Sequence, residues 1–163
     1  NVYIDILNHA RHYVYIMTPY LILDSEMEHA IRFAAERGVD VRIIMPGVPD
    51  KKTPYALAKT YYASLIKSGV KIYEYKPGFI HAKVFVCDDT KAVVGTINLD
   101  YRSLYHHFEC ATYLYKVDAI SDIYTDFIHT LASCELVTLE MLNNRPLQQK
   151  LIGTIAKIVA PLL

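Results

Sequence analysis

Three residues that can do chemistry lie close together near the middle of this sequence, in the pattern His81-x-Lys83-x-x-x-x-Asp88. On an extended strand, side chains i and i+2 share a face, so the spacing predicts that His81 and Lys83 point the same way. An imidazole can attack phosphorus or protonate a leaving oxygen near neutral pH. A fixed ammonium group beside it suits an anionic substrate, so the pair indicates chemistry on a phosphodiester.

A second polar block, Gly95-Thr96-Ile97-Asn98, follows after six further residues. Its glycine should let the backbone turn at the end of the next strand, and Asn98 can add a donor to the same anion. Lys83 and Asn98 would bind the non-bridging oxygens and stabilise the charge that builds in the transition state. We therefore predict Lys83, Thr96 and Asn98 as substrate-binding residues. No metal ion or other cofactor is expected, because Lys83 and Asn98 supply the electrostatics.

Two carboxylates complete the candidate site. Glu109 should lie in the strand after the Asn98 loop, where its carboxylate would bind the other ring nitrogen of His81 and fix the tautomer. Asp88 stands at the start of a turn, so a supporting role is favoured over direct chemistry. Chance alone would give the bare histidine–lysine–aspartate pattern in about one chain in a hundred, and the added glycine, threonine and asparagine make it roughly a thousandfold rarer. The predicted catalytic set is His81, Lys83, Asp88, Asn98 and Glu109.

The elements that position these residues alternate between strand-like and helix-like patterns, which predicts an α/β fold: a mixed β-sheet sandwiched between helices. Strands are expected at residues 13–17, 39–45, 70–75, 84–87, 92–94 and 109–115, and helices at residues 25–37, 53–68, 120–131 and from 145 onward. Ser25 with Glu28 fits a capping box, and Asp24 is an alternative cap. Thr53 and Pro54 should be the N-cap and first residue of the second helix.

Composition limits the class of protein. The chain has 163 residues, enough for one domain with a core, and 53% of them are hydrophobic, which argues against disorder. Its formal net charge is zero, so a broad basic face for nucleic acid is not expected. Cys87, Cys110 and Cys134 form no C-x-x-C pair, which favours buried thiols in a reducing compartment and argues against a zinc site.

The two ends of the sequence indicate how this domain relates to a longer protein and to the membrane. The chain opens at Asn1 without an initiator methionine or signal peptide, and we interpret residues 1–163 as one domain excised from a longer protein. Its longest apolar stretch, residues 151–163, is too short and too broken to span a bilayer. That stretch should pack on its own domain, with a membrane interface as the alternative. Lys51 and Lys52 should be solvated, with contact to anionic lipid headgroups as the alternative.

The segment from His81 to Asn98 resembles the HKD motif of the phospholipase D superfamily, followed at its usual spacing by the Gly-Ser/Thr-x-Asn block. The resemblance implies a histidine nucleophile or acid, with the lysine and the asparagine binding phosphate. It also implies that Glu109 orients the histidine and that the motif aspartate, Asp88, is mainly structural. Thr96 stands where serine is commoner in that family, a departure that keeps the hydroxyl.

Longer stretches resemble the C-terminal half of bacterial cardiolipin synthases, and together they cover nearly the whole chain. They are residues 18–20, 37–44, 69–75, 77–83, 98–103 and 161–163. The resemblance implies condensation of two phosphatidylglycerols to cardiolipin and glycerol, through a phosphohistidine intermediate and without metal. It also implies an anionic phospholipid substrate and a cytosol-facing catalytic domain that is itself soluble and is held at the cytoplasmic membrane by other parts of the protein.

One departure from that family is the number of motifs, because its sites are built from two and this chain has one. Either two copies pair, or a second motif lies in another part of the protein, and the missing start favours the second explanation. His81 would then protonate the leaving glycerol rather than attack phosphorus. Two other functions stay open. One is hydrolysis, by a phospholipase D or by a nuclease, which the balanced charge disfavours. The other is a binding or assembly module that is inactive without a second half.

Overall fold

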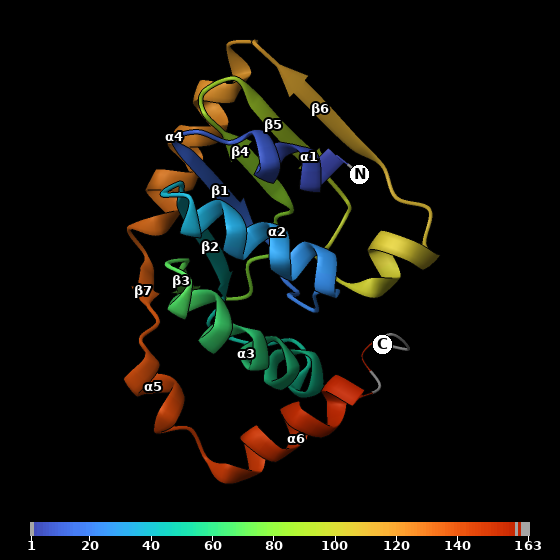
Figure 1. The fold of residues 1–163 in the computed structure, drawn as a ribbon, viewed down its shortest axis with the longest axis vertical. Helices are drawn as coiled ribbons and strands as arrows, with labels where there is room; N and C mark the ends of the chain where they lie inside the picture. Colours follow the sequence, from blue (N-terminus) through green and yellow to red (C-terminus); the bar gives the residue numbers. More distant parts are fainter. Residues whose placement is uncertain (1, 159, 161–163) are drawn as a thin grey trace.

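The computed structural model describes residues 2–158 and 160, and its central feature is a seven-stranded sheet (Figure 1). The strands are β1 (Tyr13–Met17), β2 (Asp40–Pro46), β3 (Lys71–Tyr75), β4 (Val84–Cys87), β5 (Lys91–Gly95), β6 (Ala111–Tyr115) and β7 (Cys134–Leu136), in the order β6-β5-β4-β1-β2-β3-β7. The helices are α1 (Val2–His9), α2 (Ser25–Glu36), α3 (Lys52–Lys67), α4 (Ala119–Leu131), α5 (Leu139–Asn143) and α6 (Leu147–Ile158), with a π-helical turn η1 (Arg102–His106).

Helices cover both faces of this sheet. β1, β2 and β3 run parallel to one another, whereas the remaining strands pair antiparallel with their neighbours. One face packs against α1, α2 and α3, and the other packs against α4, which lies behind the sheet in Figure 1. The predicted fold class, a mixed sheet between helices, is therefore confirmed.

Strand β1 shows how the two faces are built from one alternating sequence. Val14 and Ile16 enter the core beneath α1 and α2, while Tyr15 and Met17 enter the core beneath α4. All four are at most 5% exposed. Tyr15 also stacks on Phe127 of α4, with ring centroids 4.8 Å apart. Because β1 contributes to both cores, a slip by one residue would exchange its two faces, so the register is strongly specified.

Helix α2 begins where it is predicted and uses the alternative cap, whereas the start of α3 differs from the prediction. Asp24 is the N-cap of α2, and its Oδ1 accepts from a backbone N–H three residues on, at 2.7 Å. The predicted capping box is wrong, because Ser25 is already the first helical residue. Helix α3 begins at Lys52, and its N-cap, Lys51, makes no side-chain cap bond. The prediction of Thr53 as N-cap is therefore also wrong, because the helix begins before it.

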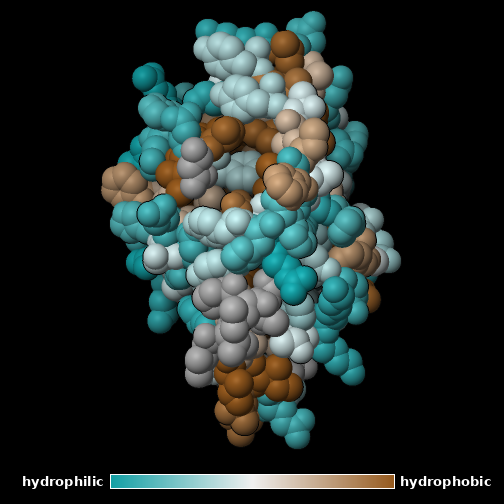
Figure 2. All heavy atoms as spheres, turned by 90° about the vertical axis from the view of Figure 1, so that its right-hand side faces the viewer, coloured by the Kyte–Doolittle hydropathy of each residue, from teal (hydrophilic) through white to brown (hydrophobic). Residues whose placement is uncertain are grey.

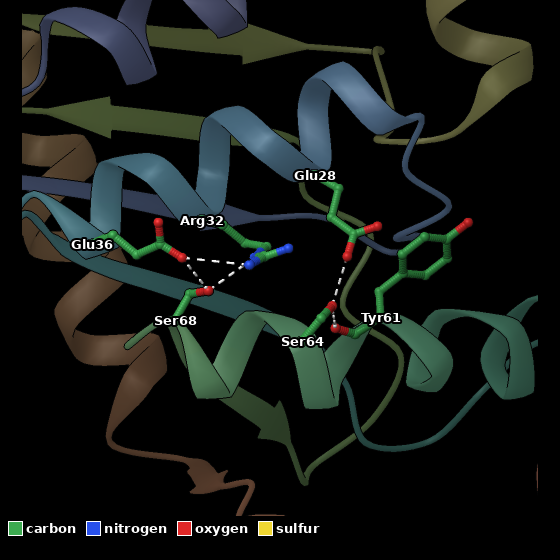
Figure 3. A network of polar contacts seen from close by, with 6 residues as sticks. All are labelled: Glu28, Arg32, Glu36, Tyr61, Ser64 and Ser68. Carbon is green, nitrogen blue, oxygen red and sulfur yellow. Dashed lines mark hydrogen bonds and ion pairs between the residues drawn. The ribbon is translucent and has the colours of Figure 1, made fainter.

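A polar network joins α2 to α3 (Figure 3). The Ser64 hydroxyl donates to Glu28 at 2.6 Å, and Arg32 Nε donates to the Ser68 hydroxyl at 2.9 Å. The Ser68 hydroxyl donates in turn to Glu36 at 2.8 Å. Each hydroxyl thus has an acceptor, and both carboxylates have a donor. The network fixes α3 along α2, and so fixes where α3 begins relative to the sheet.

The sequence does not predict four short elements: α1, η1, β7 and α5. Helix α1 supplies Ile6 and Leu7, both with 0% exposure, to the core. Strand β7 pairs antiparallel with β3 and forms one edge of the sheet. The three helical elements have five to eight residues and so contain too few turns for a helical period to stand out from chance, and β7, at three residues, is the shortest strand.

The three cysteines are all free but differ in exposure. Cys87 is buried on β4, as predicted, and burial raises the pKa of its thiol to about 12. Cys134 is partly buried, and Cys110 is exposed. The prediction of buried thiols is therefore wrong for Cys110, which precedes an edge strand whose residues are mostly exposed.

Helix α6 packs on α3 at the lower end of the molecule in Figure 1. A Cβ on Gly153 would lie 2.6 Å from the carbonyl oxygen of Ala56, so the two helices are in close contact. The predicted packing of this tail on its own domain is confirmed as far as Ile158, while residues 161–163 lie outside the described part. Figure 2 shows apolar residues gathered at this end, where three side chains of α6 are at least 56% exposed: Leu147, Leu151 and Ile155. Among the described residues, no helix has the length and hydropathy to cross a membrane.

Candidate active site

The predicted site residues gather at one edge of the sheet, where β1 and β5 end and β4 begins. Val84, the first residue of β4, pairs with Met17 at the end of β1 and with Val94 near the end of β5. His81 and Lys83 lie just before β4, outside the ladder. The block that contains threonine and asparagine follows β5 directly. Antiparallel pairing of β4 with both neighbours therefore brings the two parts of the motif together.

His81 and Lys83 form a direct contact. Lys83 Nζ lies 2.9 Å from His81 Nε2 and also donates to the carbonyl oxygen of His81 at 2.7 Å. An ammonium group has only donors, so Nε2 must be the acceptor, and the ring proton then belongs on Nδ1. The two side chains point the same way, as the spacing predicts. In this state the lone pair needed for attack or proton uptake is present on Nε2 but is covered by the lysine.

Lys83 is a buried cation, with 9% of its surface exposed. Burial lowers the pKa of its ammonium group, while the carboxylates of Glu109 and Asp100 act in the opposite direction. Neither carboxylate forms an ion pair with Lys83 among the described residues. The charge is therefore partly desolvated without being neutralised by contact, and a substrate anion would be a strong partner for it.

The Asn98 amide is only half satisfied. Its Nδ2 donates to the Ser103 hydroxyl at 3.1 Å, and its buried Oδ1 has no partner among the described residues. Rotation of the amide by 180° would exchange the two ends, so that the hydroxyl of Ser103 donates to Oδ1 and Nδ2 is free. Only this second orientation presents a donor to an anion at the site. Ser103 was not predicted, and a hydroxyl five residues after an asparagine is too weak a sequence signal to find it.

Backbone contacts hold the Asn98 loop in place. Leu99 accepts a hydrogen bond from Ile22 N at 2.7 Å and donates to the Thr18 hydroxyl at 3.4 Å, which ties the loop to the segment after β1. The Ser103 N–H donates to the carboxylate of Asp100 at 2.8 Å. The turn η1 that follows is π-helical, and such turns often occur at functional sites.

Gly95 is required for a close approach, rather than for the turn that the sequence suggests. A Cβ at this position would stand 2.3 Å from the carbonyl oxygen of Cys110 and 2.5 Å from the Cα of Ala111. Its φ is not positive; among the glycines of the described residues, positive values belong to Gly38 and Gly69. The missing side chain lets β6 come close to the end of β5, and this brings the segment before β6 to the site.

Glu109 lies at the site but not on the histidine. Its carboxylate accepts a hydrogen bond from the Thr96 hydroxyl, and its other oxygen is 3.7 Å from Nδ1 of His107. The Thr96 hydroxyl also accepts from the backbone N–H of Cys110 at 3.0 Å. Among the described residues, no hydrogen bond joins Glu109 to His81, so the role of Glu109 in orienting the imidazole stays a prediction. Thr96 is held by both contacts, and its role in substrate binding also stays a prediction.

Asp88 lies at the other end of β4, remote from the rest of the predicted set. Its carboxylate accepts from the backbone N–H groups of Arg11, His12 and Tyr13 at 2.7, 2.9 and 2.8 Å. Burial alone would raise the pKa of Asp88, but these three hydrogen bonds outweigh it, and the pKa is lowered. The structure thus separates Asp88 from His81. The contacts of Asp88 are those of a residue that fixes the start of β1.

Two adjoining hollows meet at Asn98. The first has a volume of about 450 Å³ and is lined by His81, Lys83, Gly95 and Thr96 as well as by Asn98. The second, of about 680 Å³, extends from Asn98 toward the start of α3. The site can therefore hold an anion against the histidine–lysine pair and still leave room beside it for a second group.

Known proteins were compared with this sequence and fold. Residues 3–131 match the family described as "Cardiolipin synthase, PLD-like domain". The chain belongs to this family. Over 163 residues, this PLD-like domain is 69% identical to an uncharacterised protein of Streptococcus mutans and 36% identical to cardiolipin synthase 2 of Bacillus anthracis. These matches cover 100% of the chain but 35% and 32% of the two relatives, so the domain spans about a third of their length.

The fold of the PLD-like domain also resembles solved structures. Phosphatidylserine synthase from Haemophilus influenzae superposes with a TM-score of 0.73 at 21% identity, covering 98% of this chain and 44% of that one. At this identity the similarity shows a common fold. It is consistent with the family assignment, which rests on the sequence match.

Proposed function

We propose that this PLD-like domain supplies one half of a phosphatidyltransferase that condenses two phosphatidylglycerols to cardiolipin and glycerol. The observation that carries the proposal is the contact of Lys83 Nζ with His81 Nε2, 2.9 Å apart, beside the half-satisfied amide of Asn98. Together these groups offer a cation, an amide and an imidazole to one phosphodiester. The family match and the relatives named as cardiolipin synthases support a phospholipid as that phosphodiester.

Substrate binding would rearrange the histidine–lysine contact. A phosphodiester oxygen is a stronger acceptor for the ammonium group than a neutral imidazole, because it is charged. Lys83 would turn to the phosphate, with Asn98 beside it, and Nε2 of His81 would become free to exchange a proton. The partly desolvated Lys83 is then neutralised by the substrate itself.

Two steps complete the transfer. The histidine of a second motif attacks phosphorus and forms an N–P bond, while the P–O bond to glycerol breaks. His81, which has taken up a proton from solvent on Nε2 after Lys83 turned to the phosphate, gives that proton to the glycerol oxygen. His81 then takes the proton from a hydroxyl of the second phosphatidylglycerol. The oxygen of that hydroxyl forms the new P–O bond as the N–P bond breaks, and both histidines return to their first state.

The second motif would come from another half of the protein or from another copy of this chain. The surface beside the site supports a partner, because two large side chains before β6, Tyr105 and Phe108, are at least 56% exposed. Figure 2 shows a hollow rimmed by apolar residues in the upper half of the side that carries η1 and β6. We place the reaction at the cytosolic surface of the cytoplasmic membrane, where phosphatidylglycerol is presented.

Product analysis tests the proposal. A full-length protein that contains this domain is incubated with phosphatidylglycerol vesicles, and the lipids are followed by mass spectrometry. Cardiolipin and glycerol in equal amounts are the expected products. If phosphatidic acid forms and cardiolipin does not, the reaction is hydrolysis and not transfer. No turnover in a protein that carries both motifs would favour a binding or assembly module.

A further inference from the structure

The second hollow of the site is a cleft with an excess of positive charge. It has a volume of about 680 Å³ and lies between the segment after β1, the start of α3 and the Asn98 loop. Its lining includes Lys51, Lys52 and Arg102, together with the ring of Tyr20. Asn98 belongs to this lining and to that of the hollow that holds His81, so the two spaces adjoin at this residue.

These three cations are not neutralised by the protein. None of them takes part in an ion pair among the described residues, whereas Lys59 and Lys71 are paired with Glu74 and Asp40, each at 2.8 Å. The cleft lining contains one carboxylate, that of Asp100, which is 8% exposed and accepts from the backbone N–H of Ser103. The cleft thus has a net positive charge that an anion of the substrate can balance.

The loop that carries the lysines is held in place. The Tyr20 hydroxyl donates to Asp50 Oδ2 at 2.5 Å, which ties the loop to the segment after β1. At the other end of the loop, Gly47 N donates to the carbonyl oxygen of Tyr75 at 2.8 Å. Lys52 is also the first residue of α3, so the positive end of that helix lies at the wall of the cleft and adds to the charge of the side chains.

We propose that this cleft binds the phosphodiester of the acceptor phosphatidylglycerol, with Lys51, Lys52 and Arg102 as its ligands. The inference rests on the proposed function. Cardiolipin has two phosphates joined by one glycerol, so the acceptor phosphate must lie a single glycerol away from the reacting phosphorus. The donor phosphate occupies the hollow of His81 and Lys83, and the adjoining cleft is where the second anion belongs. Neutral acceptors such as water or glycerol would gain nothing from these cations.

The test compares two reactions of one full-length protein that contains this domain. Exchange of labelled glycerol into phosphatidylglycerol needs the donor site alone, while cardiolipin formation needs donor and acceptor sites. We expect the double variant Lys51→Gln/Lys52→Gln to lower the ratio of cardiolipin formation to glycerol exchange by about tenfold or more, because two charge-assisted contacts to the acceptor are lost. Both lysines are exposed, so the fold should persist, and thermal unfolding checks this.

A matched control removes two lysines elsewhere. Lys67 is at the far end of α3, Lys91 is at the start of β5, and neither lines the cleft. Lys67→Gln/Lys91→Gln should leave the ratio unchanged. An equal fall in this control would assign the effect to general attraction to the anionic membrane and overturn the proposal. Arg102→Gln provides an independent variant of the same cleft, and it decides the matter if the double variant does not fold.

The outcomes separate the two proposals. Absence of cardiolipin from the unchanged protein contradicts the proposed function, and the acceptor cleft with it. Cardiolipin formation with an unchanged ratio in the cleft variants leaves the proposed function standing and overturns the acceptor assignment. An equal fall in both reactions would also overturn it, because it would place the lysines at the donor site. A fall confined to cardiolipin formation is the expected result.

Discussion

The two ends of β4 carry the two halves of one short motif, and their hydrogen-bonding states are opposite. At the far end, Asp88 accepts from three backbone N–H groups. At the near end, among the described residues, Lys83 is buried without a contacting carboxylate, and the Asn98 amide has one unpaired end, which is the Nδ2 donor once the amide is rotated by 180°. A group whose hydrogen bonds are all made within the protein gains little from a ligand, whereas a buried group without a partner is stabilised when a ligand binds it. The same motif therefore contains an anchor for the fold and a site for an anion.

The largest effect should come from the unsatisfied end. His81→Ala in a full-length protein should lower phosphatidyl transfer by at least about a thousandfold, since the imidazole is the group that exchanges the proton. Because His81 is exposed, the free energy of unfolding should change by less than about 0.5 kcal/mol. Product formation is measured by mass spectrometry. His129→Ala, on the exposed side of α4, is the control and should keep full activity, and near-normal product from His81→Ala would sink the assignment.

The anchor end should show the reverse pattern. Asp88→Asn replaces a charged acceptor of three N–H groups with an amide, so we expect a loss of about 2 to 3 kcal/mol in the free energy of unfolding. Activity per folded molecule should stay within about twofold, given the distance from the site. Urea unfolding measures the free energy of unfolding, and an activity assay normalised to the amount of folded protein measures the activity. Asp89→Asn is the matched control on the same turn, also at positive φ, and should cost less. A large rate loss in folded Asp88→Asn would contradict the separation.

Acid should act on the anchor end in a defined direction. The pKa of Asp88 is lowered in the folded state, so its contribution to stability is present above the ordinary aspartate value of about 3.9 and is lost as pH falls through the lowered value. The unfolding free energy of the unchanged protein should therefore fall more steeply below about pH 4 than that of Asp88→Asn. If the unfolding free energies of the two proteins fall with pH in parallel, the hydrogen bonds to Asp88 do not determine the loss of stability in acid.

Glu109 lies between the two extremes, because its carboxylate has a donor in Thr96 and also acts on the charge of Lys83. Glu109→Gln keeps an oxygen for the hydroxyl but removes the charge. We expect turnover to fall by about ten- to a hundredfold with little change in unfolding. Glu135→Gln, whose exposed carboxylate pairs with Lys76, is the control. An unchanged rate in Glu109→Gln would show that another group orients the imidazole.

The smallest effect should come from chelation. Lys83 and Asn98 supply the positive and donor groups that a metal ion would otherwise provide, so a chelator should leave the rate within about twofold of its starting value. The assay is product formation with and without the chelator. Loss of activity that a divalent ion restores would contradict this account of the unsatisfied end.

Sequence reasoning succeeds where the cause is local. The short apolar runs of β1 and β4 and the stripe of α4 predict their elements, and the i, i+2 spacing predicts the histidine–lysine contact. It fails where the cause lies far along the chain. The partners of Asp88 are 75 to 77 residues away, and the close approach that requires Gly95 involves a strand that only the fold brings near. The cleft beside Lys51 and Lys52 is likewise made by three distant segments.

The anchor on Asp88 has a consequence for genetic screens. A survey of substitutions scored by loss of growth would rank Asp88 and His81 alike, although one residue acts on the folded population and the other on the reaction. Temperature should distinguish them. Variants at Asp88 should be conditional, restored by growth in the cold, whereas variants at His81 should be null at every temperature. An invariant aspartate in such a motif would therefore record selection on folding.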